Sequence, residues 1–264
     1  MQDENKPMVK VMWTGGFDST FRICQLAKID VDIQPYYFYN KARKSADIEI
    51  ETLKKIRKMI LSKDTTKANL MPVIIHDIDE FMPIDEEYMQ AYETIKKREH
   101  YGDQYRWMAQ MSKTFPGLEL TIESCDKPEP DRFLDIMPAN NVEAHGEGVL
   151  GYYTLTENNP EDFYTLLKNF RFPMQIAHMT KKDCLQAFID MGDEDIMKET
   201  WFCQLPFNGD ACGYCGPCRQ VMDEGMSFRL SPAAQKRYKY RFWYLLKHKV
   251  IKGFKVLLGK EKIN

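Results

Sequence analysis

The chain opens with an apolar segment, a pair of glycines and an amphipathic segment, and this succession restricts its fold more than any other feature. The apolar run from Met8 to Trp13 is followed by Gly15 and Gly16, and residues 17–27 then place apolar side chains at helical spacing. A strand that turns tightly into a helix is the first half of a β-α-β unit. The opening segment therefore predicts an α/β fold.

Strand and helix patterns continue to alternate after this opening. Apolar or aromatic runs and apolar stripes predict further strands and helices, in chain order, at residues 32–39, 47–61, 73–76, 86–113 and 118–122. The helical stretch in the middle is interrupted near Gly102. Strands that alternate with helices form a parallel sheet. We expect an open parallel sheet with helices on both faces over residues 8–195.

The alternation stops between Asp126 and Asn159, where prolines and glycines recur. This composition predicts a long loop, and residues 126–151 are long enough to close over a site as a lid. Regular structure is expected again at residues 160–170. The segment Thr180–Asp183 then predicts a capping box for a helix that stops at Gly192.

The glycine pair is the first candidate site. Glycines adopt positive φ without strain and expose backbone N–H groups, and the following helix adds the positive end of its dipole. Hydroxyl donors and an acidic side chain, which can organise the turn or hold Mg²⁺, complete a predicted anion site. Its residues are Thr14, Gly15, Gly16, Phe17, Asp18, Ser19 and Thr20. The segment matches neither the Walker nor the Rossmann motif, and a plain capped turn is the alternative.

Four of the seven cysteines have the spacing of metal ligands. Cys203, Cys212, Cys215 and Cys218 follow the pattern C-x8-C-x2-C-x2-C, which suits one tetrahedral Zn²⁺. Four thiolates leave no open position for water, so we expect a structural zinc knuckle within residues 196–231. An iron–sulfur cluster and cysteine redox or sulfur-transfer chemistry are the alternatives.

The two motifs together resemble those of a known family. The turn is similar to the S-G-G-x-D-S pyrophosphate loop of N-type ATP pyrophosphatases, with Thr14 in place of the first serine. The segments Glu199–Cys203 and Asn208–Arg219 carry the E-T-x-x-C and G-D-x-C-G-x-C patterns of the 7-cyano-7-deazaguanine synthase family. The chain resembles this family over roughly residues 8–225.

The resemblance implies a PP-loop fold, of the adenine nucleotide alpha-hydrolase-like class, and an ATP-dependent ligase that requires ATP, Mg²⁺ and Zn²⁺. In this family ATP activates a carboxylate on a queuosine precursor, ammonia replaces AMP, and a second ATP dehydrates the amide to a nitrile. Asp18 and Ser19 are then the candidate catalytic residues. Arg43 and Arg106 join the turn as candidate ATP-binding residues, with a solvated surface position as the alternative.

Other readings of the same motifs stay open. The segment Tyr39–Ser45 differs from the family's pattern, so the small-molecule substrate is not identified. A tRNA sulfur transferase uses the same adenylation step together with a cysteine pair. A nucleotide-binding zinc protein without catalysis would instead recruit partners.

Charge is distributed unevenly along the chain. The net charge is −2, yet residues 232–264 contain ten Lys or Arg and one Glu, with aromatic residues among them. This tail is expected to contact an anionic membrane surface or nucleic acid, or to pack on the domain or on the second subunit of a homodimer. The polar N-terminus and the lack of a long apolar run predict a cytoplasmic protein without a transmembrane segment.

Overall fold

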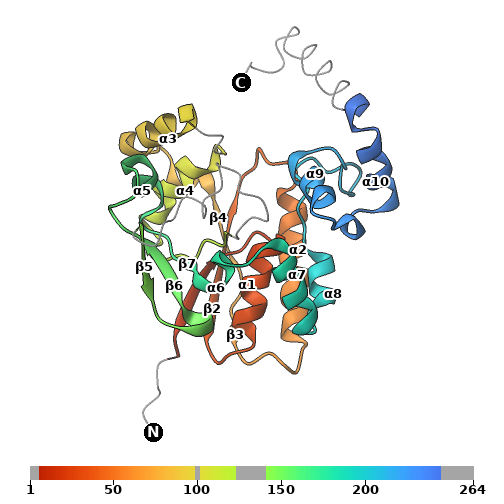
Figure 1. Ribbon diagram of the computed structural model, residues 1–264, viewed down its shortest axis with the longest axis horizontal. Helices are drawn as coiled ribbons and strands as arrows, with labels where there is room; N and C mark the ends of the chain where they lie inside the picture. The colour runs from red at the N-terminus through yellow and green to blue at the C-terminus, as the bar shows by residue number, and fades with distance from the viewer. Residues whose placement is uncertain (1–5, 99–101, 123–140, 245–264) are drawn as a thin grey trace. The chain divides into compact units, whose positions relative to one another are not determined.

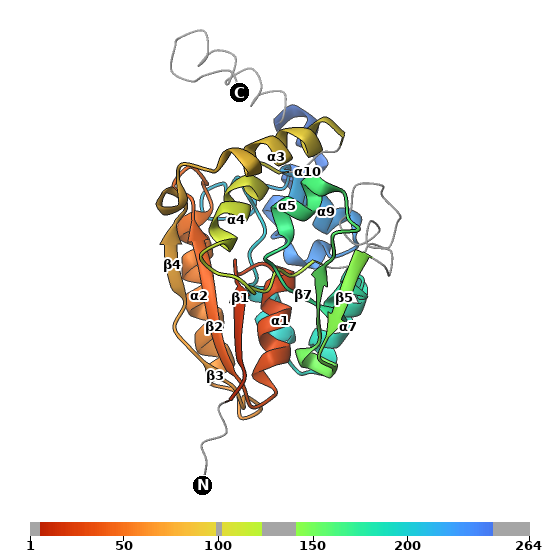
Figure 2. The same ribbon diagram turned by 90° about the vertical axis from the view of Figure 1, so that its left-hand side faces the viewer.

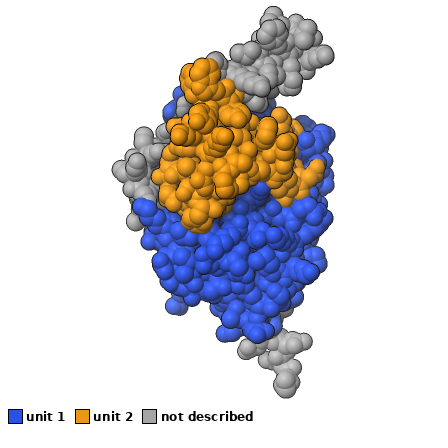
Figure 3. Space-filling view, turned by 90° about the vertical axis from the view of Figure 1, so that its right-hand side faces the viewer, with its two compact units in different colours: residues 1–41, 49–201 blue, residues 42–48, 202–264 orange. Residues whose placement is uncertain are grey.

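The computed structural model describes residues 6–98, 102–122 and 141–244 (Figure 1). The chain divides into two compact units: residues 1–41 with 49–201, and residues 42–48 with 202–264 (Figure 3). The described residues after 231 therefore belong to the same unit as the four cysteines. None of the described helices has the length and apolarity that a bilayer-spanning helix needs.

The larger unit is built on the predicted parallel sheet, which is confirmed. Its strands are β1 (Met8–Met12), β2 (Asp32–Tyr39), β3 (Asn69–Leu70) and β4 (Ile74–Asp77). Strand β2 pairs with β1 on one edge and with β3 and then β4 on the other, all in parallel register. Figure 2 shows β1, β2 and β4 side by side.

Alternating side chains of β2 contact helices on the two faces of this sheet. Tyr36 and Phe38 belong to an apolar cluster shared with three helices, whereas the Tyr37 hydroxyl donates to Glu49 on another helix, at 2.9 Å. A strand with both faces covered is apolar throughout, as the aromatic run in β2 indicates. The helices of the cluster are α3 (Glu86–Arg98), α4 (Gln104–Ser112) and α5 (Glu161–Leu167).

The remaining helices of the larger unit include those predicted at residues 17–27, at residues 47–61 and after Thr180. Leu53, Ile56 and Ile60 are buried along one face of α2, while Lys54 and Lys55 are exposed. These helices are α1 (Phe17–Ala27), α2 (Ala46–Leu61), α6 (Met174–Ala177), α7 (Lys181–Asp190) and α8 (Glu194–Glu199), with 3₁₀ turns at Ile78–Phe81 and Gly148–Leu150. The first residues of α2 count with the smaller unit.

The loop predicted between residues 126 and 159 is wrong over its described part. Strands β5 (Val142–His145) and β6 (Tyr152–Leu155) form an antiparallel hairpin, and β7 (Phe172–Pro173) pairs with β6. The glycines lie in the connection of the hairpin, where Gly146 and Gly148 have positive φ. Residues 126–140 lie outside the described residues, so the predicted lid remains a prediction there.

The fourth strand predicted at residues 118–122 is also wrong in extent. A single residue, Glu119, bridges Val11 of β1 on one side and Arg171 on the other, both in parallel. Backbone hydrogen bonds of 2.8–3.1 Å join this segment to β1 and to residue 171. The apolar run was long enough for a strand, but a strand also needs partners along its length, and here the ladder is one residue long.

The smaller unit carries little regular structure. Its helices are α9 (Gly216–Asp223) and α10 (Pro232–Lys239), with a 3₁₀ turn at Ser227–Arg229. Ser231 caps α10, since its hydroxyl accepts a hydrogen bond from the Ala234 N–H at 3.0 Å, and Pro232 occupies the first helical position. The Ser231 cap and Pro232 together set the start of α10.

Candidate functional site

The four predicted metal ligands converge in the smaller unit. All four Sγ atoms lie within 4.8 Å of one another, and all four cysteines are buried. Cys203 and Cys212 flank a turn, while Cys215 and Cys218 lie at the start of α9. By contrast, Cys24 and Cys184 are buried separately in the larger unit, as expected of packing residues.

The spacing of the sulfur atoms fits a tetrahedral ion. Zn–S bonds of about 2.3 Å imply sulfur–sulfur distances of roughly 3.8 Å along the edges of the tetrahedron. The Sγ atoms of Cys212 and Cys218 are 3.8 Å apart, and those of Cys215 and Cys203 are 3.9 Å apart. The four cysteines are therefore positioned to bind a metal ion and are compatible with zinc.

Backbone N–H groups point at these sulfur atoms and favour their thiolate forms. The Cys212 N–H donates to the Cys203 Sγ at 3.1 Å, and the Cys215 N–H donates to the Cys212 Sγ at 3.2 Å.

Asn208 and Gly209 both adopt positive φ in the turn between Phe207 and Asp210, which exchange two backbone hydrogen bonds. An Asn-Gly pair is the usual occupant of such a turn, so the sequence itself sets the approach to Cys212.

Crowding of the thiols moves their pKa values in opposite directions. The hydrogen bond with Cys203 lowers the pKa of Cys212 to about 7, and a hydrogen bond with Cys203 also lowers that of Cys215. Hydrogen bonding raises the pKa of Cys203, chiefly through Cys212, and that of Cys218, chiefly through Cys203. Metal binding must displace the protons that these sulfur atoms share, so the affinity for metal falls as the pH falls.

Helix α10 closes over the cysteine turn so tightly that only glycine fits beneath it. Gly213 has φ of +81°, and a Cβ atom at this position would lie 2.2 Å from the Ala234 carbonyl oxygen. Gly216 faces open space, with nothing within 4 Å of an added Cβ. The two glycines therefore differ: only Gly213 is required by a neighbouring helix.

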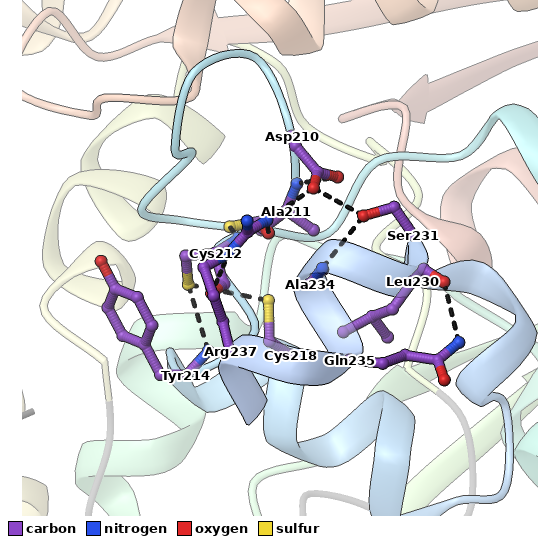
Figure 4. Close-up of polar contacts among 11 residues, drawn as sticks. Asp210, Ala211, Cys212, Tyr214, Cys218, Leu230, Ser231, Ala234, Gln235 and Arg237 are labelled. Carbon is purple, nitrogen blue, oxygen red and sulfur yellow. Dashed lines mark hydrogen bonds and ion pairs between the residues drawn. The ribbon is translucent and has the colours of Figure 1, made fainter. Parts of the chain in front are cut away.

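A buried arginine from α10 ties this helix to the cysteine turn (Figure 4). The Arg237 guanidinium donates to the carbonyl oxygens of Cys212 at 3.1 Å and Ala211 at 2.7 Å, and to the Asp210 carboxylate at 2.5 Å. The Ser231 hydroxyl donates to the same carboxylate at 2.6 Å. Partial burial works to raise the pKa of Asp210, but these hydrogen bonds outweigh it and hold the pKa below its usual value.

The glycine turn lies in the larger unit, between β1 and α1. Gly15 has φ of +72°, and an added Cβ atom would lie 3.1 Å from the Thr52 methyl group, so glycine is needed there. Gly16 is the N-cap of α1 and supplies no capping side chain, which leaves the first turn of the helix without a side-chain acceptor. The Trp201 N–H donates to the Gly15 carbonyl oxygen at 2.9 Å, so the segment preceding Cys203 is anchored to the turn.

The hydroxyl groups around this turn differ in their burial and in their hydrogen-bond partners. The hydroxyl oxygens of Thr14 and Ser19 lie 3.4 Å apart, and the Gly16 N–H donates to the Thr14 hydroxyl at 3.3 Å. Thr20 is fully buried, and its hydroxyl accepts a hydrogen bond from the Trp13 indole N–H at 2.9 Å. Thr20 therefore anchors α1 to β1, while Thr14 and Ser19 remain at the turn itself.

Asp18 has a partner that the sequence analysis missed. The Lys181 ammonium group donates to the Asp18 carboxylate and lies 5.2 Å from the centre of the Phe17 ring. Lys181 is the first residue of α7, directly after the Thr180 cap. The only sequence signal was that capping box, which placed Lys181 at a helix start but did not reveal that the start lies beside the glycine turn.

The two predicted ATP-binding arginines lie on different parts of the chain. Arg106, on α4, forms an ion pair with Asp103 at 2.6 Å. Arg43 precedes α2 and belongs to the smaller unit, where its carbonyl oxygen accepts from the Ala46 N–H at 3.1 Å. Their assignment to ATP stays a prediction.

A second residue pair near α1 also escaped the sequence analysis. The Arg22 guanidinium is fully buried and forms two hydrogen bonds of 2.7 and 2.8 Å with the Glu119 carboxylate. It also donates to the Val149 carbonyl oxygen at 2.7 Å. Because both charges are buried and satisfied, the pair fixes α1 to the 119 segment and to the hairpin connection.

The fold and the cysteine cluster together define an α/β protein with a four-cysteine site positioned for a metal ion. A scan against models of known protein families finds no match, and a search among curated proteins finds no significant similarity. Arguments about function therefore rest on the geometry and chemistry of these two sites.

Proposed function

We propose that this chain is an ATP-dependent ligase of the PP-loop fold, which adenylates a carboxylate on a nucleobase-like substrate and releases pyrophosphate, similar to 7-cyano-7-deazaguanine synthase. One observation carries the proposal: an uncapped helix N-terminus follows a positive-φ glycine at the carboxyl end of β1, with the Lys181 ammonium group beside it. Ligands of open α/β sheets gather at the carboxyl ends of the strands.

Each residue of the turn has a role in this proposal. The first-turn N–H groups of α1 and the Lys181 ammonium would hold the pyrophosphate that leaves, so that fixed dipoles and a cation meet the developing charge. The Ser19 and Thr14 hydroxyls add hydrogen-bond donors at the same place. Asp18 holds Lys181 in position, and its carboxylate is also the group that would hold Mg²⁺, which neutralises phosphate charge when bound.

The metal of the cysteine cluster has a structural role in this proposal, and we assign it as zinc. All four ligands are sulfur atoms, so the ion has no open position for water. Zinc bound there cross-links the turn at Cys203 to α9.

The proposal is tested by incubating the purified chain with Mg²⁺, ATP, ammonium and a carboxy-deazaguanine. We expect AMP and pyrophosphate as products, and we expect Lys181→Met and Ser19→Ala each to lower the rate of pyrophosphate release by about a hundredfold. Lys198→Gln is the matched control, because within the described ranges this exposed lysine forms an ion pair only with Glu194, one helical turn away, and it should leave the rate unchanged.

Other products would contradict the proposal. Release of ADP and phosphate would contradict adenylation, and a rate of pyrophosphate release that is equal in wild type and Lys181→Met would remove Lys181 from the site. Sulfur transfer to tRNA is the main alternative. Cys215→Ser and Cys218→Ser should unfold the smaller unit if the cluster is structural, and should abolish only turnover in a folded protein if these cysteines carry sulfur.

A further inference from the structure

Four aromatic side chains are exposed at the C-terminal end of the described chain. Phe242 and Trp243 keep 70% and 68% of their surface accessible, and Tyr240 and Tyr244 keep 46% and 37%. They follow α10, at a tight turn and at helical residues 241–244. Large apolar side chains exposed side by side are uncommon on a monomer and mark a contact surface.

The cations among these rings make contacts with aromatic rings but form no ion pairs within the part of the chain that the structure describes. Lys236, Lys239 and Arg241 have no acidic partner within ion-pair distance among the residues that the structure describes. Arg241 lies over the Tyr238 ring, 4.2 Å from its centre, and Lys239 lies 6.0 Å from the centre of the Tyr240 ring. The neighbouring Arg237 differs from them, because it forms an ion pair with Asp210.

The base of this segment is fixed in the smaller unit. Arg237 and the Ser231 cap hold α10 on the cysteine turn, and the Tyr244 ring stacks on the Tyr214 ring at 5.7 Å between centres. Phe242 and Trp243 contact each other edge to face, at 6.0 Å. The cysteine cluster therefore presents these rings and cations on an ordered support.

We propose that residues 236–244, the aromatic-basic segment, bind the surface of an anionic membrane. Tryptophan and tyrosine place an apolar body and a polar tip at the boundary between headgroups and acyl chains, and adjacent Lys and Arg side chains neutralise anionic headgroups. The exposed Phe242 ring has no polar atom, so its transfer from water into the apolar part of a bilayer is favourable.

The sequence after the segment favours a membrane over a nucleic acid. Residues 245–264 add six lysines and one glutamate, and they also add eight Leu, Ile and Val residues. Nucleic-acid binding uses cations and aromatic rings but gains little from aliphatic side chains. Peripheral membrane binding uses all three, because cations meet headgroups while aliphatic and aromatic side chains enter the boundary.

The experiment is flotation of the full chain with vesicles of phosphatidylcholine alone or with about a third phosphatidylserine. We expect the chain to float with the anionic vesicles, to float less as salt rises, and to stay in solution with the neutral ones. The double variant Phe242→Ser/Trp243→Ser should reduce the partition coefficient at least about tenfold. Phe228→Ser is the matched control, since Phe228 is a 50% exposed aromatic of the same unit outside the segment, and it should bind as wild type does.

A second readout separates binding from folding. Trp243 emission, taken as the difference between wild type and Trp243→Phe, should shift to the blue on anionic vesicles, and the metal content of every variant should stay that of wild type. Three results would overturn the proposal. The first is that the chain does not float with anionic vesicles. The second is that it binds RNA tightly and leaves the vesicles only when RNA competes, and the third is that it forms a dimer without vesicles and the double variant is monomeric.

Discussion

At the scale of single residues, the cysteine turn shows how a neighbouring helix decides what one position tolerates. Gly213 and Gly216 are three residues apart and flank Cys215, and the sequence offers no way to rank them. The structure places the Ala234 carbonyl against Gly213 and nothing against Gly216. Glycine is therefore essential at the first position and replaceable at the second.

Gly213→Ala is expected to destabilise the smaller unit by roughly 2 kcal/mol or more, because it combines left-handed strain with a steric clash. Gly216→Ala should be neutral or stabilising, since Gly216 begins α9 in open space and alanine favours helix. Urea midpoints and bound metal per chain measure both effects. Equal midpoints for the two variants would show that α10 does not press on Gly213.

At the scale of elements, the start of α7 combines a cap with a charge. The Thr180 hydroxyl accepts from the Asp183 N–H at 3.2 Å, and the Asp183 carboxylate accepts from the Thr180 N–H at 2.8 Å. This reciprocal box fixes the first turn of the helix, and Lys181 is the first residue of that turn. A local sequence signal thus sets the position of a residue assigned to the phosphate site.

Thr180→Ala is expected to lower the free energy of unfolding by about 1 kcal/mol, as loss of an N-cap does. Thr94→Ala is the control, because Thr94 is exposed in the interior of α3 and caps nothing, and its effect should stay within about 0.5 kcal/mol. Thermal unfolding monitored by circular dichroism measures both. A Thr180→Ala variant as stable as the control would mean that the box contributes nothing.

The same box makes a prediction about pH. Hydrogen bonds from the Thr180 N–H and, as the smaller cause, from the Thr180 hydroxyl lower the pKa of Asp183 below 3.8. Because the folded value is the lower one, the carboxylate stabilises the fold above the unfolded pKa, and this contribution is lost as pH falls through the folded value. Carboxyl NMR titration should find the Asp183 midpoint below 3.8 in wild type and closer to that value in Thr180→Ala. A midpoint unchanged by the mutation would contradict the share assigned to the hydroxyl, because alanine keeps the N–H and loses only the hydroxyl.

At the scale of the whole molecule, each of the two units is stabilised internally by a different kind of contact. The larger unit has an apolar cluster that includes Phe38, Tyr92, Phe163 and Phe172 around its sheet. The smaller unit has short helices, and its buried centre contains the four cysteines and the polar contacts of Arg237. A bound metal is therefore expected to matter much more to the smaller unit.

Removal of the metal by a chelator is expected to unfold the smaller unit while the larger unit keeps its protected core. Hydrogen exchange should rise at residues 203–237 and stay slow in β1 and β2, and added zinc should restore protection. Elemental analysis of the purified chain distinguishes zinc from iron. Slow exchange at the cysteine turn after complete metal removal would contradict a stabilising metal.

Local signals in the sequence were sufficient for much of the fold. Strands β1, β2 and β4, the helices from α1 to α4 and the cap of α7 follow apolar periodicity and capping patterns, which act within a few residues. The hairpin at residues 142–155 was missed because its strands are four residues each and are separated by glycines. The short ladder at Glu119 was overestimated because strand length depends on distant partners.

By itself, the sequence determined the class of fold and the four cysteines that are positioned for a metal ion, because cysteine spacing and side-chain periodicity are local properties of the chain. Tertiary structure alone decided which side chains meet across long separations. It paired Lys181 with Asp18, buried Arg22 against Glu119, and set Arg237 on the cysteine turn. Such contacts join residues 25 to 163 positions apart, and no local pattern encodes the path that brings them together.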